Sequence, residues 1–348
     1  MLLIYGSTGY TGRLIVAEAL ARGLRPTLVA RNADAVRAQA EALGLEWRAA
    51  PLDDAAKLDA ALTGTRVVIH CAGPFAHTWR AMSDACMRAG AHYLDITGEI
   101  AVFEGLAARD VDAKAAGVML MPGTGFDVVP SDCLAAHLAG RLPDATHLAL
   151  AFQAAGGVSR GTSLTIIEGL GQPGAVRRNG KIVFVPQAWD TRAIDFGDGR
   201  PRETMTIGWG DVFTAYHSTG IPNIAVYTAV PTTVRLSAIA SRHIGPVLRS
   251  GFVQRMLRAS VKRTIDGPSA ASRDGTASLL WGEATTASGA TVTARLRAPN
   301  AYTLTAQTAV LIATKVLGGN APPGFQTPAR AYGAEVILEI PGVTRSSD

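Results

Sequence analysis

The stretch Gly6-Ser7-Thr8-Gly9-Tyr10-Thr11-Gly12 decides the fold of this chain. It follows the apolar run at residues 2–5 and precedes apolar residues at helical spacing over 14–20. A second apolar run, at 27–30, comes next. In such a strand, loop, helix and strand, glycines let the backbone approach a pyrophosphate, and the helix N-terminus attracts its charge. The stretch therefore predicts a dinucleotide-binding parallel sheet of the Rossmann type.

The glycine spacing in this loop is GxxGxxG rather than GxGxxG, because Thr8 stands where the second glycine would be. This difference affects the shape of the loop more than its role. An ordinary glycine-rich turn is the alternative interpretation. We expect the whole loop to contact the cofactor, that is Gly6, Ser7, Thr8, Gly9, Tyr10, Thr11 and Gly12.

The end of the second strand favours NADP(H) over NAD. NAD sites place an acidic residue there for the ribose 2′-hydroxyl, whereas this chain reads Ala30-Arg31-Asn32, with no carboxylate before Asp34. The Arg31 guanidinium can stack on the adenine and bind a 2′-phosphate through charge-assisted hydrogen bonds; an exposed surface arginine is the alternative. Asp53, after a short strand at 45–49, is expected to contact the adenine amino group.

Further apolar strands, predicted at 66–70, 92–96 and 117–121, end in loops at the sheet edge where such folds bind ligands. Ala72, Gly73 and Pro74 in the first of these loops are predicted cofactor contacts. Hydride transfer belongs to the cofactor, so the protein must position the acceptor and manage one proton. The candidate proton donors in the later loops are Asp95, Glu99 and Asp127; each has a structural role as its alternative, and water can also supply the proton.

From residue 145 the pattern changes to shorter alternating segments, which predict an open mixed sheet with helices against one face. This second domain would cover the nicotinamide and supply the substrate pocket. His217 lies in its polar, aromatic stretch and is a catalytic candidate, with an ordinary loop histidine as the alternative. Residues 302–317 predict a helix that ends at Gly318-Gly319.

We therefore expect an α/β protein with an N-terminal Rossmann parallel sheet. An inserted second α/β domain should contain the mixed sheet, and a C-terminal helix should return to the first domain. The expected NADP-binding domain comprises residues 1–126 and 300–348, and the second domain comprises residues 127–299.

Composition excludes several classes of protein. The 348 residues carry 33 Lys+Arg and 28 Asp+Glu, a net charge of +5, and 48% are hydrophobic, so the chain can fold around a large core. This charge makes a weak case for nucleic acid as a partner. Three cysteines without metal-ligand spacing argue against a disulfide framework and a zinc site, so we expect no metal and a reducing cytoplasm. Neither a signal peptide nor a transmembrane helix is expected.

The positive charge is concentrated between residues 232 and 265, which contain seven basic and no acidic residues: Arg235, Arg242, Arg249, Arg255, Arg258, Lys262 and Arg263. The rest of the chain therefore has a net charge of −2, since +5 less +7 is −2.

Gly245-Pro246 is expected to split this basic stretch into two helices. In the second helix, Arg255, Arg258 and Lys262 share a face. The opposite band is apolar: Leu248, Phe252, Val253, Met256, Leu257 and Val261. The apolar band can pack on the core, or the helix can contact an anionic membrane surface, an acidic carrier or a phosphate-bearing substrate.

Several separate motifs resemble the saccharopine dehydrogenase-like oxidoreductases and, among them, the trans-acting enoyl reductase branch. They are GSTGYTG (6–12), CAGPF (71–75), YLDITGE (93–99), PGTGFDVVPSD (122–132), WGDVFTAYHSTGIPNI (209–224), AYTLTAQTAVLIATKVL (301–317) and PPGFQTPARAYG (322–333). The resemblance implies the two-domain fold with a returning helix, NADP(H) as cofactor, and NADPH-dependent reduction of a C=C bond in a lipid-like or polyketide-like substrate.

Two alternatives stay open. One is a saccharopine-type amino acid dehydrogenase, although the chain shows no paired-arginine motif for a dicarboxylic amino acid. The other is an NADP-binding, membrane-associated or scaffolding protein with little turnover. The expected partner is a small-molecule or carrier-bound lipid-like substrate, not nucleic acid, and a homodimer is left open. We expect a cytoplasmic location, with peripheral membrane contact through residues 232–265 as a further alternative.

Overall fold

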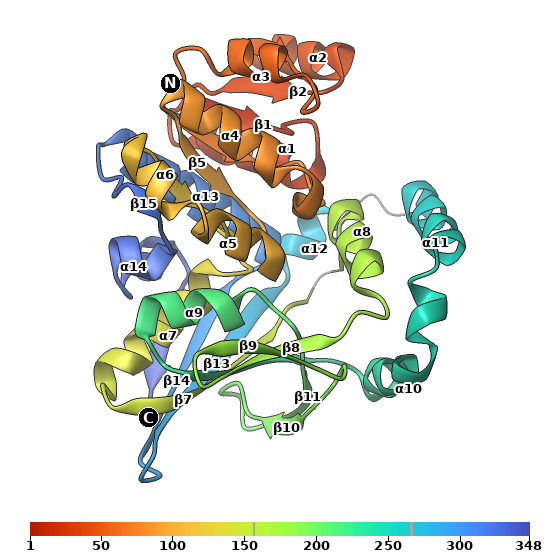
Figure 1. The fold of residues 1–348 in the computed structure, drawn as a ribbon, viewed down its shortest axis with the longest axis vertical. Coiled ribbons are helices and arrows are strands. Elements are labelled where there is room, and N and C mark those ends of the chain that lie inside the picture. The colour runs from red at the N-terminus through yellow and green to blue at the C-terminus, as the bar shows by residue number, and fades with distance from the viewer. Residues whose placement is uncertain (156, 265–266) are drawn as a thin grey trace. The chain divides into compact units, whose positions relative to one another are not determined.

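The structure, a computed structural model, describes residues 1–155, 157–264 and 267–348, apart from the side chains at 243 and 262–264. The chain divides into two compact units. Unit 1 comprises residues 1–129 and 302–331, and unit 2 comprises residues 130–301 and 332–348. Figure 1 follows the chain through both units, from red at the N-terminus to blue at the C-terminus. The expected α/β class with an inserted second domain is confirmed.

Unit 1 contains a parallel sheet whose central strands are buried along their whole length. The strand order is β15 (Gly324–Phe325), β6 (Met119–Met121), β5 (His92–Asp95), β4 (Val67–His70), β1 (Leu2–Tyr5), β2 (Thr27–Ala30) and β3 (Trp47–Ala49). A parallel sheet is covered on both faces, so β1, β2 and β4 read as continuous apolar runs in the sequence. β15 was not predicted, because two residues carry no strand pattern.

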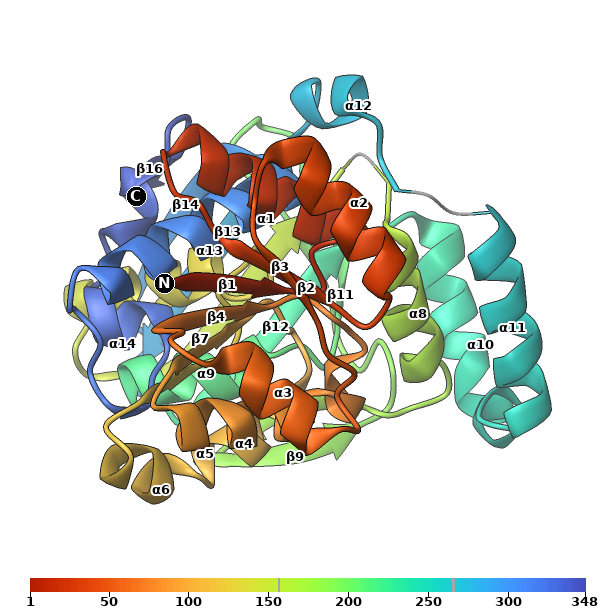
Figure 2. The same ribbon diagram turned by 90° about the horizontal axis from the view of Figure 1, so that it is seen from above.

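Helices cover both faces of this sheet (Figure 2). One face carries α1 (Tyr10–Ala21) and α2 (Ala33–Leu43), and the other carries α3 (Ala55–Leu62), α4 (Trp79–Ala89) and α5 (Ile100–Ala107). The short helix α6 (Asp110–Ala115) follows α5. This doubly wound arrangement brings the carboxyl ends of the strands to one edge of the sheet, where the loops that we predicted to bind the cofactor begin.

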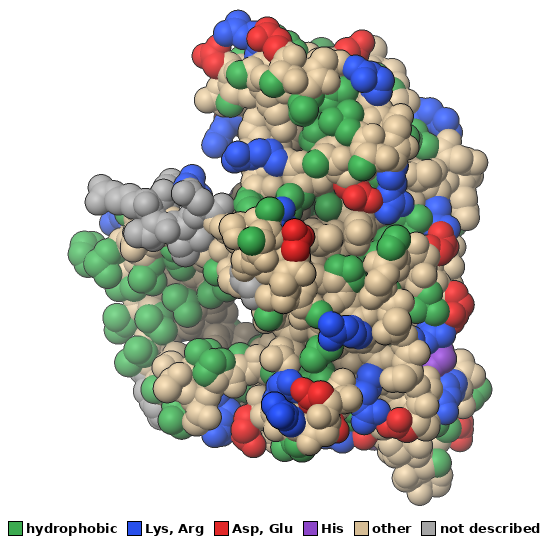
Figure 3. Space-filling view, turned by 180° about the vertical axis from the view of Figure 1, so that it is seen from behind, with side chains coloured by type: hydrophobic (Ala, Val, Ile, Leu, Met, Phe, Trp, Pro, Cys, Tyr) green, Lys and Arg blue, Asp and Glu red, His purple; other side chains and the backbone are tan. Residues whose placement is uncertain are grey.

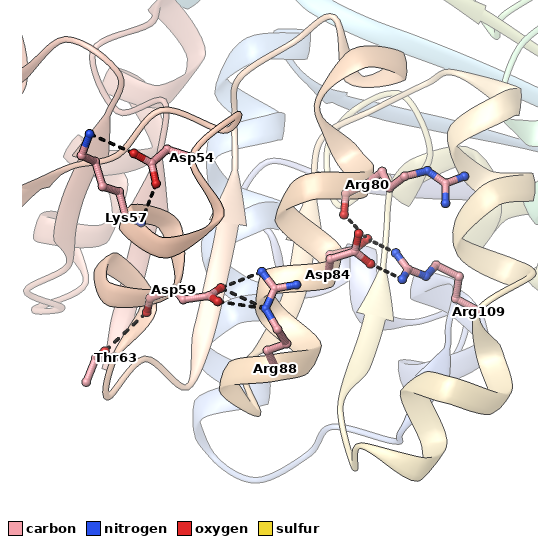
Figure 4. Close-up of polar contacts among 9 residues, drawn as sticks. Asp54, Lys57, Asp59, Thr63, Arg80, Asp84, Arg88 and Arg109 are labelled. Carbon is pink, nitrogen blue, oxygen red and sulfur yellow. Dashed lines mark hydrogen bonds and ion pairs between the residues drawn. The ribbon is translucent and has the colours of Figure 1, made fainter.

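Polar contacts join the helices of the second face at their surfaces (Figure 4). The Asp54 side chain caps the N-terminus of α3. The Arg88 guanidinium on α4 donates two hydrogen bonds of 2.7 and 3.0 Å to the Asp59 carboxylate on α3. Arg109, after α5, pairs with Asp84 on α4. The exposed pair of Arg88 and Asp59 contributes at most about 1 kcal/mol, so the buried sheet provides most of the stability of unit 1.

The expected returning helix is α13 (Ala301–Leu317), and all of it beyond residue 301 belongs to unit 1. The Thr305 hydroxyl oxygen accepts a hydrogen bond of 3.0 Å from the Phe126 amide, and the Thr308 hydroxyl donates one of 2.8 Å to the Thr124 carbonyl. These contacts attach the helix to the loop that follows β6.

Unit 2 contains a mixed sheet, as expected. Its order is β10 (Thr191–Ile194), β11 (Arg202–Thr206), β12 (Asn223–Ala229), β7 (Ala145–Gln153), β13 (Ala277–Thr286), β14 (Thr291–Pro299) and β16 (Thr344–Ser347). The hairpin of β8 (Gly174–Arg178) and β9 (Lys181–Val185) pairs with β12. β12 and β7 are parallel, and the other pairs are antiparallel.

Helices α7 (Val129–Arg141) and α9 (Asp211–Thr219) lie beside this sheet. Gly282 of β13 allows the close approach of α7, because a Cβ there would overlap Leu138 and press on Leu134. Elsewhere in the unit a compact apolar cluster forms around β7, β10, β12 and β13, from Ala151, Ile194, Phe196, Tyr227 and Trp281. The remaining helices of unit 2 are α8 (Arg160–Gly169), α10 (Thr232–Leu248), α11 (Gly251–Thr264) and α12 (Ala270–Asp274).

The C-terminal segment differs from our expectation, which placed residues 300–348 in the first domain. Residues 332–348 belong to unit 2, after α14 (Pro328–Tyr332) and a short 3-10 turn (Val336–Glu339). The reason is a strand pairing: β16 lies antiparallel to β14, with Arg345 opposite Leu296. A four-residue polar strand has no apolar alternation, so the sequence did not show this pairing.

The prediction that Gly245-Pro246 separates two helices is wrong. α10 passes through both residues and ends at Leu248, and the break before α11 falls at residues 249–250. Pro246 lies in the last turn of α10, so its missing N–H removes one hydrogen bond near the helix end. The Arg249 amide still donates to the Gly245 carbonyl at 3.0 Å. Among the described residues, no helix is both long and apolar enough to cross a membrane.

Candidate functional site

The glycine loop joins β1 to α1 at the carboxyl edge of the sheet in unit 1. Gly6 has a φ of +82°, and a Cβ there would lie 3.0 Å from the Ala72 amide nitrogen. A Cβ on Gly12 would collide with the Gly6 carbonyl oxygen, and one on Gly9 would lie 3.3 Å from the same oxygen. The three glycines therefore keep the backbone open at the N-terminus of α1, which is where a pyrophosphate binds.

Ser7 is fully buried and its side chain faces α2. The Ser7 hydroxyl donates to the Gln39 amide oxygen at 2.9 Å, and the Gln39 side-chain amide donates to the Ser7 carbonyl at 3.0 Å. Because the Ser7 hydroxyl is bonded to Gln39, the predicted contact of Ser7 with the cofactor would come from its backbone. Sequence reasoning missed Gln39, because no motif links positions 32 residues apart.

The second half of the loop lies nearer to solvent. Gly9 is exposed, and Thr8, Tyr10 and Thr11 are half-buried. The Tyr10 ring meets the ring of Tyr302, at the start of α13, edge to face with centroids 5.1 Å apart. Tyr302 therefore helps to position the glycine loop, and its only sequence signal was its place at the start of the returning helix.

The end of β2 presents the predicted determinants of cofactor choice. Ala30 is buried, whereas Arg31 and Asn32 are exposed. The Asn32 side chain accepts a hydrogen bond of 3.0 Å from the Ala35 amide and so caps α2. The exposed Arg31 guanidinium remains the group suited to a 2′-phosphate.

Asp53 and Arg31 both lie near the hydroxyl group of Tyr5, the last residue of β1. Tyr5 donates to the Ala50 carbonyl at 2.8 Å, and burial raises the pKa of Tyr5 to about 12. The Arg31 charge acts to lower this pKa and the Asp53 charge acts to raise it, so both charged groups are close to Tyr5. The ends of β2 and β3 thus offer one cation and one carboxylate where the adenosine half of a dinucleotide would lie.

Glu99 organises the loop that contains Ala72, Gly73 and Pro74. Its two carboxylate oxygens accept hydrogen bonds of 2.8 Å from the amides of Phe75 and Ala76, at the start of the short 3-10 helix Phe75–His77. These bonds assign a positioning role to Glu99, one of the three carboxylates that we considered for proton transfer.

The Thr78 side chain also holds the loop that contains Ala72, Gly73 and Pro74. The Thr78 hydroxyl donates to the Ala72 carbonyl at 2.8 Å and lies 3.0 Å from His70 Nε2. His70 is fully buried, and burial lowers its pKa to about 3, so the ring is neutral. Neither His70 nor Thr78 has a motif around it that marks it in the sequence.

Asp95 is fully buried at the end of β5 and joins two loops. Its carboxyl accepts hydrogen bonds from the Tyr93 hydroxyl at 2.6 Å and from the amides of Thr97 and Gly123 at 3.0 and 2.9 Å. Burial is the main reason why the pKa of Asp95 rises to about 7, against the lowering effect of these bonds. All three donors belong to the protein fold, so the geometry favours a structural role for Asp95.

Asp127 is half-buried, as is Glu99. It lies against Gly98, where an added Cβ would approach its Oδ2 to 3.1 Å. Burial raises the pKa of Asp127 to about 7, and the charge of Glu99 acts in the same direction. A carboxyl with a pKa near neutrality can hold a proton at working pH and donate it, which a general acid must do.

The structure thus gathers the predicted Asp95, Glu99 and Asp127 at the carboxyl ends of β5 and β6. His217 lies in unit 2, on α9, where its ring stacks on Phe213 with centroids 4.5 Å apart. Among the described residues, no group of three or more Asp, Glu, His or Cys side chains could hold a metal ion.

The buried Asp95 predicts a specific pH dependence of stability. Its pKa is about 7 in the folded protein against the ordinary aspartate value of 3.8, so the unfolded chain ionises first as the pH rises. The free energy of unfolding should therefore fall between about pH 4 and pH 7, by on the order of 4 kcal/mol for this group alone. The Asp95→Asn variant mimics the protonated form, so its free energy of unfolding should not fall in this way over the same pH range.

The measurement is urea unfolding of the wild type and the Asp95→Asn variant across this pH range. Parallel pH profiles for the two proteins would contradict the assignment. At about pH 4, Asp95→Ala is expected to be about 3 kcal/mol less stable than the wild type, because it leaves three buried donors without their acceptor, and like Asp95→Asn it should lose the fall with pH.

A parallel sheet with a glycine loop at its carboxyl edge defines a dinucleotide-binding domain. Residues 2–121 match the family model of the saccharopine dehydrogenase NADP binding domain. The first unit is therefore similar to that NADP-binding domain over residues 2–121, and the glycine positions at which an added Cβ would close the loop fit a bound NADP(H).

Curated relatives carry related names. A Mycobacterium tuberculosis protein, provisionally named as a trans-acting enoyl reductase, is 32% identical over an alignment of 184 residues that covers 48% of this chain and 43% of the relative. The trans-acting enoyl reductase of Mycobacterium leprae is 32% identical over an alignment of 140 residues that covers 38% of this chain and 33% of that protein. The chain therefore spans less than half the length of these relatives.

A solved structure shares the fold over the whole chain. The saccharopine dehydrogenase (L-Glu forming) of Saccharomyces cerevisiae superimposes with a TM-score of 0.66 at 12% identity. The match covers 100% of this chain and 99% of that one. At this identity the similarity shows the fold alone.

Arg31 gives a direct test of cofactor choice. Arg31→Asp removes a cation and places a carboxylate beside the 2′-phosphate, so we expect NADPH to bind about thirtyfold more weakly, a change of roughly 2 kcal/mol. NADH, which has a free 2′-hydroxyl, should be affected little. Titration of both cofactors checks this, and equal losses for the two would show that Arg31 does not contact the phosphate.

Proposed function

We propose that this chain is an NADPH-dependent oxidoreductase that reduces an enoyl or enone-like C=C bond in a lipid-like or polyketide-like substrate, either free or bound to a carrier. The observation that carries the proposal is the glycine loop with exposed Arg31 in a domain of the NADP-binding family. The enoyl substrate is supported by the names of relatives that match part of the chain.

When bound, NADPH supplies the hydride. The protein's own residues must hold the acceptor and provide one proton for the carbon next to the carbonyl group. Asp127 is the best-placed side chain for this role, because its carboxyl is half-buried with a pKa of about 7. Glu99 and Asp95 act as positioning residues through their bonds to the neighbouring loops. The three cysteines are free, which supports the proposed cytoplasmic location.

The experiment follows NADPH consumption by the purified full chain with a panel of 2-enoyl thioesters and enones. A parallel series offers amino acid and 2-oxo acid pairs, including lysine with 2-oxoglutarate. Turnover with the unsaturated acceptors alone supports the proposal. Turnover with the amino acid series would replace it with a saccharopine-type reaction. Tight NADPH binding without turnover of any acceptor would indicate the scaffolding alternative.

A further inference from the structure

Helices α10 and α11 present apolar side chains to solvent. Phe252 is 70% exposed, Val247 is 59% exposed and Met256 is 56% exposed. Further large apolar side chains on α10 are also exposed, namely Val234, Leu236 and Ile244. Figure 3 shows the resulting concentration of hydrophobic surface, in green, on the side of the molecule that carries these helices. Six large apolar side chains on two consecutive helices make an unusual amount of exposed apolar surface for ordinary solvated helices.

The opposite side of α11 packs against α8. The Gln254 side-chain amide donates to the Ile167 and Leu248 carbonyls at 2.9 Å, and Arg258 pairs with Glu168 at 3.3 Å. Val253, Leu257 and Val261 are half-buried, whereas Phe252 and Met256 lie one turn apart on the outer side. The alternative in which the apolar band packs inward therefore holds for only part of the band.

Exposed arginine side chains lie on the same two helices as these exposed apolar side chains. Arg235 and Arg258 have acidic partners in unit 2, and the Arg242 guanidinium donates to backbone carbonyls. Arg249 and Arg255 are exposed, and among the described residues no hydrogen bond or ion pair involves their side chains. Lys262 and Arg263 belong to the same segment, but their side chains lie outside the described part. Residues 232–264 contain no Asp or Glu that could neutralise these charges.

We propose that the outer face of α10 and α11 binds the surface of an anionic lipid bilayer. We call this face the α10–α11 face and define it by Val247, Phe252 and Met256 together with Arg249 and Arg255. Apolar side chains of an interfacial helix enter the boundary between headgroups and acyl chains, while arginines meet lipid phosphates. The proposal does not depend on the reaction that the protein catalyses.

Charge favours a bilayer over a second copy of the chain. A twofold dimer through this face would bring the same arginines of two copies together, and like charges at an interface are unfavourable. An anionic bilayer offers the complementary charge over a broad, adaptable surface. Its attraction should weaken as salt screens the exposed charges.

The experiment is co-sedimentation of the full chain with phosphatidylcholine vesicles, with and without phosphatidylglycerol. We expect binding to the anionic vesicles that falls with added salt. The double substitutions Phe252→Ser with Met256→Ser, and Arg249→Glu with Arg255→Glu, should each lower the partition coefficient about tenfold.

Matched controls come from β9 and from exposed loop and strand positions. Phe184 is also 70% exposed, so Phe184→Ser should leave partitioning unchanged. Arg200→Glu with Arg297→Glu removes the same number of exposed arginines elsewhere in unit 2 and should have little effect. Thermal melting verifies that each variant is folded.

Three results would overturn the proposal. The first is no binding to anionic vesicles at low salt, and the second is an equal loss of binding in the control variants. The third is a dimer in sedimentation that the Phe252 and Met256 substitutions dissociate, without vesicle binding, since this would assign the α10–α11 face to a second copy. NADPH turnover by the same samples is read separately, so failure of either proposal leaves the other standing.

Discussion

The Gly12→Ala variant is expected to bind NADPH roughly a hundredfold more weakly than the wild type. A Cβ at this position would collide with the Gly6 carbonyl oxygen, which belongs to the backbone and cannot rotate away. The loop must therefore move at the N-terminus of α1, where the pyrophosphate needs its amides. A displacement of this kind in a packed site costs about 3 kcal/mol, which corresponds to the hundredfold change.

A fluorescence titration of NADPH measures this effect, with thermal melting as the check on folding. Gly140→Ala on α7 is the matched control, because a Cβ there meets no atom within 4 Å and the residue is exposed. Alanine also favours a helix over glycine, so the Gly12 variant should not fail through helix propensity. An affinity equal to that of the control would show that the loop does not hold the cofactor.

The Asp127→Asn variant is expected to lose roughly a hundredfold in the rate of enoyl reduction, the usual scale for removal of a general acid. Burial and the neighbouring Glu99 raise the pKa of Asp127 to about 7. Its protonated fraction therefore falls as the pH rises through 7, and the wild-type rate should fall with it. Asparagine cannot donate this proton and does not titrate, so the residual rate of the variant should be flat over the same range.

The pH profile distinguishes proton donation from a merely structural role. Asp144→Asn, at an exposed position in unit 2, is the control and should retain the wild-type profile. A full rate with the same pH dependence in Asp127→Asn would show that water supplies the proton. NADPH affinity is measured in parallel and should be unchanged, since the proposed role concerns the acceptor.

The sequence predicted those features that local patterns determine. The buried strands β1, β2 and β4 are continuous apolar runs, and the glycine loop needs its glycines for steric reasons that a linear motif preserves. The positions of Asp95, Glu99 and Asp127 after successive parallel strands were enough to place them at one edge of the sheet, because the carboxyl ends of those strands share that edge.

The features that the sequence did not reveal depend on contacts between distant segments. Gln39 binds Ser7, Tyr302 meets Tyr10, and neither pair has a local pattern. The exposure of Phe252 could not be predicted either. An apolar residue on an amphipathic helix gives the same sequence pattern whether its side chain packs inward or faces solvent.

The most direct test of the central claim uses NADPH deuterated at the transferable position of the nicotinamide. The purified chain is incubated with this cofactor and a 2-enoyl thioester, and the products are examined by mass spectrometry. We predict a saturated thioester that carries one deuterium at the β-carbon, formed by the wild type and lost in Gly12→Ala. Binding of the labelled NADPH without deuterium in any product would contradict the account.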